Sequence, residues 1–299
     1  MAVVGPTASG KSDLAERIAD ALNAEILSVD SMQVFRGMDI GTAKPDEETR
    51  WRFGYHLVDV ADPSEDYTVA QFQRAGVEVL DRAEKAGTTI VVAGGSGLHF
   101  RSLMDPLEFP PTDDELRSDL EALSSDDLKR QLLSADPDAG TVVDLANPRR
   151  VLRAVEIWSL TGDTPTERAA TKQADAVRSY KPVRPFVAVG LDPGEDLSDR
   201  IEERFDQMLT AGLLDEVNRL AARMGRTARQ AVGYRELLRV VEEGSPLAEA
   251  RAATIAATTA LAKRQRTFFR RDPRIRWIPW HHDAEALATT ALEGFEGSR

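Results

Sequence analysis

The stretch GPTASGKS at residues 5–12 follows a short apolar run, AVV at 2–4, and leads into a helical pattern. It matches G-x-x-x-x-G-K-[ST] at every fixed position, in the strand-to-helix context that this motif requires. Its glycines permit a tight turn, and its amides and the start of the following helix converge on phosphate oxygens. The lysine adds a positive charge, and the final hydroxyl is placed to reach a magnesium ion. We therefore expect the whole loop to hold phosphate groups: Gly5, Pro6, Thr7, Ala8, Ser9, Gly10, Lys11 and Ser12.

Apolar, β-branched runs bounded by turn residues recur along the chain and alternate with helical patterns. They predict strands at 2–4, 24–29, 56–60, 88–93 and 185–191, and a weaker one at 275–279. Short buried strands that alternate with helices are typical of βαβ units. We expect an α/β fold with a P-loop NTPase-like, doubly wound parallel sheet, in which ligands bind at the carboxyl ends of the strands.

The alternation stops between residues 113 and 183, where the sequence is charged, poor in strand patterns and helix-like. We expect a helical insertion over 113–183 that interrupts a core formed by residues 1–112 and 184–299. Within the returning part, residues 247–271 predict a long Ala-rich helix with a basic end. The first strand is very short, which leaves open a start codon upstream.

The composition is that of an ordinary globular protein of 299 residues, with 42% hydrophobic and 29% charged residues. The absence of cysteine excludes disulfides, zinc–thiolate sites and thiol nucleophiles. No stretch resembles a signal peptide or a membrane span, so we expect a cytoplasmic protein with no membrane partner. We also expect a monomer.

The charge distribution is uneven. A net charge of -12 argues against a protein that coats nucleic acid without specificity. Residues 263–276, however, hold seven basic residues against one aspartate, around Phe268 and Phe269. Such a run predicts either a solvated helix face or a docking surface.

Two aspartates are candidates for a role beside the phosphate loop. Asp30 ends the strand predicted at 24–29 and opens a polar loop, beside the place where bound phosphates would project. Taken alone, an aspartate in this position is more often a helix cap or a turn residue. Asp59 in HLVDV is the alternative candidate for handling a metal ion. The strand where a kinase would carry its metal aspartate ends instead in GGSG at 94–97.

Seven further stretches follow the phosphate loop in a fixed order. They are SVDSMQVFRGMDIGTAKP at 28–45, HLVD at 56–59, GGSGLH at 94–99, NPRRVLRAVEI at 147–157, RIEERFDQML at 200–209, QAVGYRE at 230–236 and LAKRQRTFFR at 261–270. With this ordered set the chain resembles the bacterial tRNA dimethylallyltransferases, also called tRNA isopentenyltransferases or the IPP transferase family, over roughly residues 3–280.

The resemblance implies transfer of a dimethylallyl group from dimethylallyl diphosphate to N6 of the adenosine 3′-adjacent to the anticodon, in tRNAs that read codons starting with U. The phosphate loop then holds a diphosphate leaving group, with Mg2+ as cofactor. Asp30 matches the family's catalytic aspartate, and a carboxylate there can orient the adenine amine and accept its proton. The resemblance also implies that Lys11 and Arg204 stabilise the departing diphosphate, with Arg200 as a weaker candidate.

The resemblance further implies contacts with the tRNA anticodon stem-loop, which the helical insertion would grip. The implied contact positions are Asp30, Ser31, Met32, Gln33, Ser96, Arg117, Arg149, Arg150, Arg153, Gln230, Gly233, Tyr234, Arg235, Lys263, Arg264, Gln265 and Arg270. Their basic members reconcile an acidic chain with an RNA partner. The chain departs from the family pattern in GGSGLH, where Ser96 keeps the hydroxyl of the usual threonine and His99 replaces a tyrosine.

Three alternative hypotheses remain open. A small-molecule kinase of the same loop class needs a metal-binding aspartate on a core strand and an adenine-recognition segment, and the sequence assigns neither. A transferase that prenylates free adenine nucleotides would lack the helical insertion and the basic last third. An RNA-binding module that switches with nucleotide binding would not need Asp30.

Overall fold

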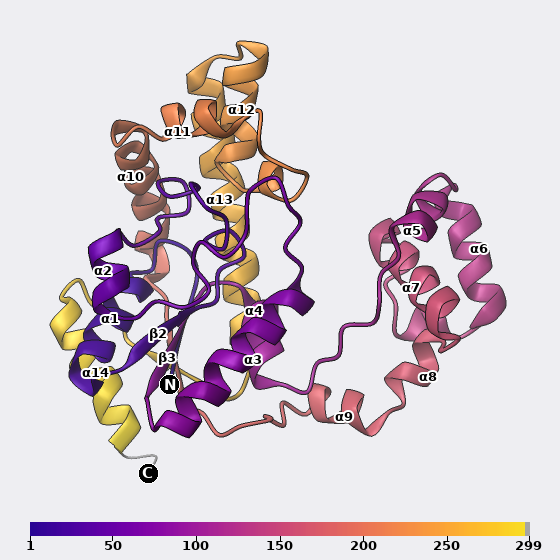
Figure 1. Ribbon diagram of the computed structural model, residues 1–299, viewed down its shortest axis with the longest axis horizontal. Coiled ribbons are helices and arrows are strands. Elements are labelled where there is room, and N and C mark those ends of the chain that lie inside the picture. The colour runs from indigo at the N-terminus through magenta and orange to yellow at the C-terminus, as the bar shows by residue number, and fades with distance from the viewer. Residues whose placement is uncertain (297–299) are drawn as a thin grey trace. The chain divides into compact units, whose positions relative to one another are not determined.

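The computed structural model describes residues 1–296, which form two compact units (Figure 1). The first unit combines Met1–Met104 with the returning chain from Arg184 onward, and the second unit is Asp105–Val183. The second unit therefore begins before residue 113, where the insertion was expected to start. Each unit has its own hydrophobic core, so each is described by itself.

A parallel sheet forms the centre of the first unit, and within residues 1–296 it has five strands in the order β2-β3-β1-β4-β5. The strands are β1 (Ala2–Val4), β2 (Glu25–Ser28), β3 (Ile90–Gly94), β4 (Ala188–Leu191) and β5 (Ile275–Ile278). This sheet confirms the predicted parallel α/β fold. β1 is the central strand, and its last residue, Val4, lies beside Gly94 and Gly190. The phosphate loop therefore leaves the middle of the sheet at its carboxyl edge, where ligands of such sheets bind.

Helices cover both faces of this sheet. The helices of this unit are α1 (Lys11–Leu22), α2 (Glu47–Arg52), α3 (Val69–Ala86), α4 (Gly97–Met104), α10 (Leu197–Thr210), α11 (Leu213–Leu220), α12 (Tyr234–Glu243), α13 (Leu247–Arg270) and α14 (Ala284–Glu296), with short 3-10 turns at Gly194–Asp196 and Ala228–Gln230. The long helix predicted at 247–271 is thus confirmed as α13. Among residues 1–296, none of the helices combines the length and the apolar character that crossing a bilayer requires.

Alternate residues of each strand belong to different cores, as expected for strands that are buried on both faces. In β1, Ala2 and Val4 belong to the core formed with α3, α4 and α13, whereas Val3 belongs to the core formed with α1 and α14 (Figure 1). Leu14 and Ile18 supply the apolar stripe of α1 at the spacing that one helix face requires. The sequence period therefore explains the three-layer arrangement of this unit.

The strand predicted at 56–60 is wrong. Only an isolated bridge between Leu27 and His56 joins this segment to β2. Leu57 and Asp59 have φ angles of 60° and 56°, in the left-handed region that interrupts an extended strand. Asp59 is held there by ion pairs with Lys44, at 2.6 Å, and with Arg50. These tertiary contacts override the β-branched pattern of the run.

The second unit is helical, as the insertion was expected to be. Its helices are α5 (Asp114–Glu121), α6 (Ser125–Ala135), α7 (Pro148–Thr161), α8 (Pro165–Ala169) and α9 (Lys172–Arg178), with a 3-10 turn at Ala139–Thr141. Its small core centres on Leu132 of α6 and on Val151 and Val155 of α7. Asn147 caps the start of α7 by accepting from the backbone amides of Arg149 and Arg150, so the two arginines open the helix with their side chains exposed.

Candidate active site

The phosphate loop connects the central strand to α1 and leaves no room for larger residues at its first position. A Cβ on Gly5 would lie 2.2 Å from the carbonyl oxygen of Leu191, so only glycine fits beside β4. Gly10, with a φ of 85°, directly precedes α1 and turns the chain into the helix. The loop therefore presents its amides and the positive end of α1 to one space, as the motif predicts.

Lys11 is the principal cation of the loop. Its Nζ donates to the carbonyl oxygen of Pro6 at 3.1 Å, which folds the side chain back over the loop. Burial, together with the positive charge of Arg204, lowers the pKa of Lys11 to about 8, and Asp30 opposes the shift. Lys11 therefore carries a charge that its surroundings do not fully compensate, as a site that receives an anion requires.

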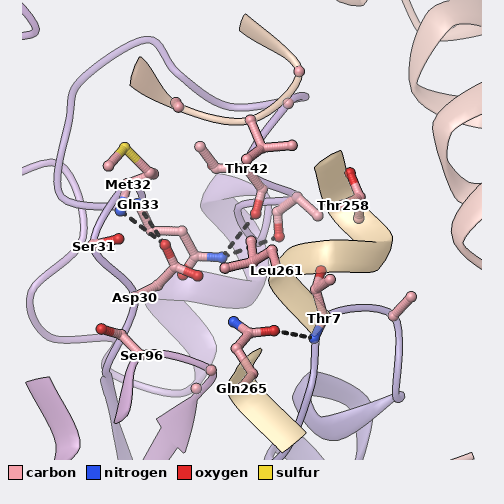
Figure 2. A pocket seen from close by; sticks show the side chains of 18 of the residues that line it. Thr7, Asp30, Ser31, Met32, Gln33, Thr42, Ser96, Thr258, Leu261 and Gln265 are labelled. Atoms are coloured by element: carbon pink, nitrogen blue, oxygen red, sulfur yellow. Dashed lines mark hydrogen bonds between the residues drawn. The ribbon is translucent and has the colours of Figure 1, made fainter. Parts of the chain in front are cut away.

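A cavity of about 350 Å³ joins this loop to the carboxyl ends of β2 and β3. Its lining comes from the phosphate loop, from residues 28–33 and 41–45, from the glycine turn at 93–97, and from α10 and α13. Figure 2 shows Asp30 and Ser96 on one side of this cavity and Thr7 with Gln265 on another. The predicted phosphate site and the predicted aspartate are therefore parts of one space.

Asp30 lies at the mouth of β2 and is half-buried. Its Oδ1 accepts from the backbone amides of Met32 at 2.8 Å and of Gln33 at 3.3 Å (Figure 2). The alternative interpretation of Asp30 as a turn residue is thus partly correct, because one oxygen holds the turn. Among the described residues Oδ2 has no hydrogen-bond partner, so this oxygen remains available to a ligand. One carboxylate can therefore serve both the turn and the reaction.

Ser96 is oriented by the residue that departs from the family pattern. Its Oγ forms a hydrogen bond of 2.6 Å with Nδ1 of His99, and the His99 ring packs edge-on against Phe72 with centroids 4.5 Å apart. Burial lowers the pKa of His99 to about 4, although the nearby Asp30 opposes the shift. His99 is therefore neutral at physiological pH, and it fixes the Ser96 hydroxyl at the edge of the cavity.

Two arginines of α10 take different positions beside the phosphate loop. Arg204 lines the cavity and is half-buried, and burial is the main cause that lowers its pKa, while Asp30 opposes the shift. It makes no ion pair with the residues that the structure describes, so its guanidinium can bind an anion. Arg200 instead donates from Nε to the carbonyl oxygen of Ala8 at 2.8 Å. Arg204 is thus better placed than Arg200 to contact a diphosphate, a role that the resemblance implies and that stays a prediction.

The side chain of Gln33 holds the cavity wall together. Ser28 Oγ donates to its Oε1 at 2.8 Å, and its Nε2 donates to the carbonyl oxygens of Thr42 and Ala43 at 3.2 and 3.3 Å (Figure 2). Gln33 is only 9% exposed. Because these bonds occupy both ends of the amide, its side chain fixes the loop at 42–43, while its contact with tRNA stays a prediction.

Glu216 of α11 is a positioning residue that the sequence analysis missed. Its buried carboxylate accepts from the backbone amides of Asp39, Ile40 and Gly41 at 2.9–3.2 Å, and from the Tyr234 hydroxyl at 2.5 Å. Tyr234 is fully buried, and a Cβ on Gly41 would lie 2.4 Å from its ring. The Tyr234 side chain, predicted to contact tRNA, therefore supports the wall of the cavity. No local motif marks Glu216, since the three backbone amides that it binds lie about 175 positions away in the sequence.

One face of α13 forms a continuous wall of the cavity. The residues that line it recur at helical spacing: Thr254, Thr258, Leu261, Arg264, Gln265 and Phe268. Gln265 accepts from the Thr7 amide at 2.8 Å, and Phe268 is 37% exposed against Gly97. The basic, aromatic end of α13 therefore meets both glycine-rich turns, which favours the docking-surface interpretation of the 263–276 run.

An apolar part of the cavity was not predicted. Ile201, Phe205 and Met208 of α10 face it together with Leu213 and Val232. Ile201, Phe205 and Met208 recur at the spacing of one helix face, but an apolar face that packs into a core has the same spacing as one that lines a pocket. The pattern therefore gave no sign of a ligand. This wall can receive a small branched hydrocarbon.

The remaining predicted tRNA contacts of the first unit lie partly on its surface and partly in the cavity. Gln230, Arg235, Lys263, Arg264 and Arg270 are exposed. Arg270 also pairs with the buried Asp192 at 3.1 Å. Ser31, Met32 and Gly233 line the cavity itself. Exposed arginine and lysine side chains can still reach phosphates, so these positions stay predictions.

In the second unit, the four predicted arginines divide into two pairs. Arg149 and Arg150 are exposed at the start of α7. Arg153 and Arg117 instead pair with the fully buried Glu156, at 2.8 and 3.4 Å. The first pair is exposed and can contact an RNA backbone, although Arg150 lies 3.9 Å from Asp144 in a loose ion pair, whereas the second pair also holds the unit together.

The residues of the cavity do not form a closed metal site. Among residues 1–296, no group of three His, Cys, Asp or Glu side chains could hold a metal ion by itself. Asp59, the alternative metal candidate, has both oxygens in ion pairs with Lys44 and Arg50. The cavity offers the hydroxyl of Ser12 and the carboxylate of Asp30. Mg2+ commonly takes few protein oxygens and completes its shell with phosphate and water, so this donor set fits a metal that arrives with a diphosphate.

Comparison with known proteins places this site in a family. Residues 33–272 match the family model described as IPP transferase. The chain is 42% identical over 286 residues to a tRNA dimethylallyltransferase of Streptomyces avermitilis, covering 93% of this chain and 89% of that one. It is 41% identical over 305 residues to a tRNA dimethylallyltransferase of Thermobifida fusca, covering 98% and 92%.

Solved structures agree with this result. The crystal structure of the full-length tRNA isopentenylpyrophosphate transferase from Bacillus halodurans has a TM-score of 0.72 and 33% identity, over 99% of this chain and 95% of that chain. A eukaryotic dimethylallyltransferase acting on tRNA shares the fold, with a TM-score of 0.82 at 24% identity, over 100% of this chain and 79% of that chain. The match to the family model, together with relatives of about 40% identity along nearly the whole length, shows that this chain belongs to the IPP transferase family.

Proposed function

We propose that the protein transfers a dimethylallyl group from dimethylallyl diphosphate to N6 of the adenosine 3′-adjacent to the anticodon, in tRNAs that read codons starting with U. One observation carries the proposal: a single cavity contains the phosphate loop, an available aspartate oxygen and an apolar wall. A kinase needs the first of these and can use the second, whereas transfer of a branched alkyl group from a diphosphate uses all three. The relatives named tRNA dimethylallyltransferase support the identity of both substrates.

Asp30 would act on the nucleophile. The lone pair of the adenine amine is delocalised into the ring, so N6 is a weak nucleophile until a base orients it. Oδ2 of Asp30 would accept a hydrogen bond from N6 and take its proton as the bond to carbon forms. The amides of Met32 and Gln33 fix the direction of this carboxylate through Oδ1. As N6 bonds to the allylic carbon, the carbon–oxygen bond breaks and its electron pair leaves with the diphosphate.

The opposite end of the cavity would hold the leaving group. Lys11 and Arg204 would face the diphosphate oxygens together with the loop amides, and these charges matter most as negative charge develops on the departing group. Prenyl transfer generally uses a divalent metal, and Mg2+ held by Ser12 and the diphosphate would neutralise part of that charge. The apolar side chains of α10 would surround the branched hydrocarbon.

The RNA would present its base from a single-stranded loop, where turning a base out of the stack costs only a few kcal/mol. Phe268 offers an aromatic surface at the cavity edge, close to the exposed Lys263 and Arg264. Arg149 and Arg150 of the second unit would add contacts to the anticodon stem-loop phosphates.

The deciding experiment is mass spectrometry of an unmodified anticodon stem-loop RNA after incubation with the protein, Mg2+ and dimethylallyl diphosphate. We expect the adenosine 3′ of the anticodon to gain the mass of one dimethylallyl group. A matched RNA with guanosine at that position should gain nothing. An unchanged adenosine together with rapid ATP hydrolysis would instead support the kinase or the nucleotide switch. Prenylation of free adenine nucleotides but not of RNA would support the nucleotide-specific transferase.

A further inference from the structure

The phosphate loop is held from outside by side chains of three separate elements. Gln265 of α13 accepts from the Thr7 amide at 2.8 Å, as described above. Arg200 of α10 donates to the carbonyl oxygen of Ala8 at 2.8 Å. Trp280, which follows β5, donates from Nε1 to the carbonyl oxygen of Ser9 at 3.1 Å. Three consecutive loop residues are therefore tied to parts of the chain about 190 to 270 positions away.

The middle residue of this trio has a backbone conformation that its side chain disfavours. Ala8 has a φ of 60°, in the left-handed region where a Cβ crowds the following carbonyl oxygen. Such a conformation persists only where the surroundings over-determine it. Ala8 is 6% exposed, and the two carbonyl oxygens at Ala8 and Ser9 are the groups that Arg200 and Trp280 bind. The two donors therefore act at the strained point of the loop.

Arg200 and Trp280 also contact each other. The guanidinium carbon of Arg200 lies 5.1 Å from the centroid of the Trp280 ring, a cation–π geometry. The indole therefore fixes the arginine and binds the loop at the same time. Trp280 is half-buried and does not line the cavity, so it cannot act on a substrate directly. We call Arg200 and Trp280 the loop brace.

We propose that the loop brace holds the phosphate loop in the shape that binds the prenyl diphosphate, which makes Trp280 a positioning residue. The inference rests on the proposed function only for the identity of the diphosphate substrate. Without the indole donor, the strained residue is free to relax and the loop amides lose their common direction. The diphosphate is bound both before and during the reaction, so the brace acts mainly on its binding.

The test replaces Trp280 with phenylalanine, which keeps a ring under Arg200 but removes the Nε1–H donor. We expect the dissociation constant of dimethylallyl diphosphate, measured by calorimetry without RNA, to rise about fivefold, the effect of losing one ordinary hydrogen bond. In turnover assays the KM for dimethylallyl diphosphate should rise likewise, while kcat and the KM for RNA change less than about twofold. Arg200→Lys is a second variant that loses the bond to Ala8, and it should weaken the same constant if Trp280→Phe folds poorly.

Trp277→Phe is the matched control. Trp277 lies on β5 with Arg270 over its ring at 5.4 Å, but it makes no bond to the phosphate loop among the described residues. The same substitution there should leave diphosphate affinity unchanged. An equal loss in both variants would reveal a general effect on β5 and overturn the proposal, as would unchanged affinity in Trp280→Phe and Arg200→Lys.

The Ala8→Gly variant tests whether the loop brace acts through the backbone strain at Ala8. Glycine adopts a φ of 60° about as readily as a negative one, so in this background Trp280→Phe should weaken affinity by less than about twofold. A loss as large as in the wild-type background would separate Trp280 from the strain at Ala8 and refute the inference. Because these readouts measure diphosphate binding without RNA, they stand even if the wild-type protein proves unable to alkylate RNA, an outcome that would refute the proposed function alone.

Discussion

Lys11 gives the phosphate loop a pH dependence whose sign follows from its surroundings. Burial, aided by Arg204 and opposed by Asp30, lowers the pKa of Lys11 from 10.5 to about 8. A bound diphosphate places negative charge beside the ammonium group and favours its charged form, so the pKa of Lys11 is higher in the complex. Binding therefore takes up a proton wherever the pH exceeds about 8.

The size of the effect follows from the fraction of charged lysine. At pH 9, one unit above the pKa of the free protein, about one molecule in ten carries the charge, so the dissociation constant of dimethylallyl diphosphate should rise about tenfold between pH 7 and pH 9. Below pH 8 the constant should level off, because Lys11 is then mostly charged. The ligand itself contributes little over this range, since phosphate esters complete their ionisation near pH 6.

Calorimetry in two buffers with different ionisation heats measures both quantities. We expect uptake of nearly one proton per ligand bound at pH 9 and little uptake at pH 7. Lys11→Met is the control, with weaker affinity that no longer depends on pH. A constant affinity from pH 7 to pH 9 without proton uptake would contradict the lowered pKa of Lys11, and with it the electrostatic argument for this loop.

Three further predictions concern single side chains. Asp30→Asn should lower kcat by about 10²-fold or more while RNA still binds, since the general base is lost. Asp39→Asn is the control and should leave kcat unchanged. If Asp30→Asn abolishes RNA binding instead, Asp30 is a recognition residue. Lys11→Met should raise the free energy of unfolding at pH 7 by up to about 3 kcal/mol, because it removes a buried charge. Between pH 8 and 10.5 the unfolded wild type binds more protons than the folded wild type, so its free energy of unfolding should rise with pH. The difference in free energy of unfolding between the variant and the wild type should therefore shrink from pH 7 to pH 10. Urea titrations at the two pH values measure it, and a larger difference at pH 10 would contradict the prediction. Glu216→Gln should lower the free energy of unfolding by about 2 kcal/mol and weaken prenyl diphosphate binding, whereas unchanged urea midpoints would contradict its role at Asp39–Gly41.

The sequence predicted the parts of this protein that depend on local pattern. The glycine spacing of the phosphate loop and the buried runs of β1 to β5 are short-range signals, so the sheet and the loop followed directly. Asp30 was a candidate because it follows a strand at the edge where ligands bind, but only the family resemblance ranked it above an ordinary turn residue. The strand predicted at 56–60 was wrong because ion pairs between Asp59 and the side chains of Lys44 and Arg50 hold the backbone outside the strand region, and the pattern of the run itself does not contain these contacts.

What the sequence could not provide are the residues that act across long separations. Glu216 is one acidic residue among many on a helix, and its role appears only when three amides of the loop at 39–41 meet it. Trp280 lies beyond the last stretch that carries the family resemblance, although its indole N–H binds the phosphate loop, which is the first of these stretches. Ile201 and Phe205 carry the period of an ordinary core helix. In each case the deciding fact is a contact, which residue spacing does not encode.

The end of β3 decides between the two chemistries that a phosphate loop permits. A kinase of this class would need a carboxylate there to handle its metal. In this protein a Cβ on Gly94 would lie 2.4 Å from the carbonyl oxygen of Val29, and a Cβ on Gly97 would lie 2.1 Å from the Phe268 ring. Because Val29 directly precedes Asp30, the close approach at Gly94 that excludes a side chain also brings the backbone of Asp30 next to the turn. The packing that holds the aspartate at the cavity therefore removes the metal carboxylate of a kinase, and Gly94→Asp should destroy the site rather than convert it to phosphoryl transfer.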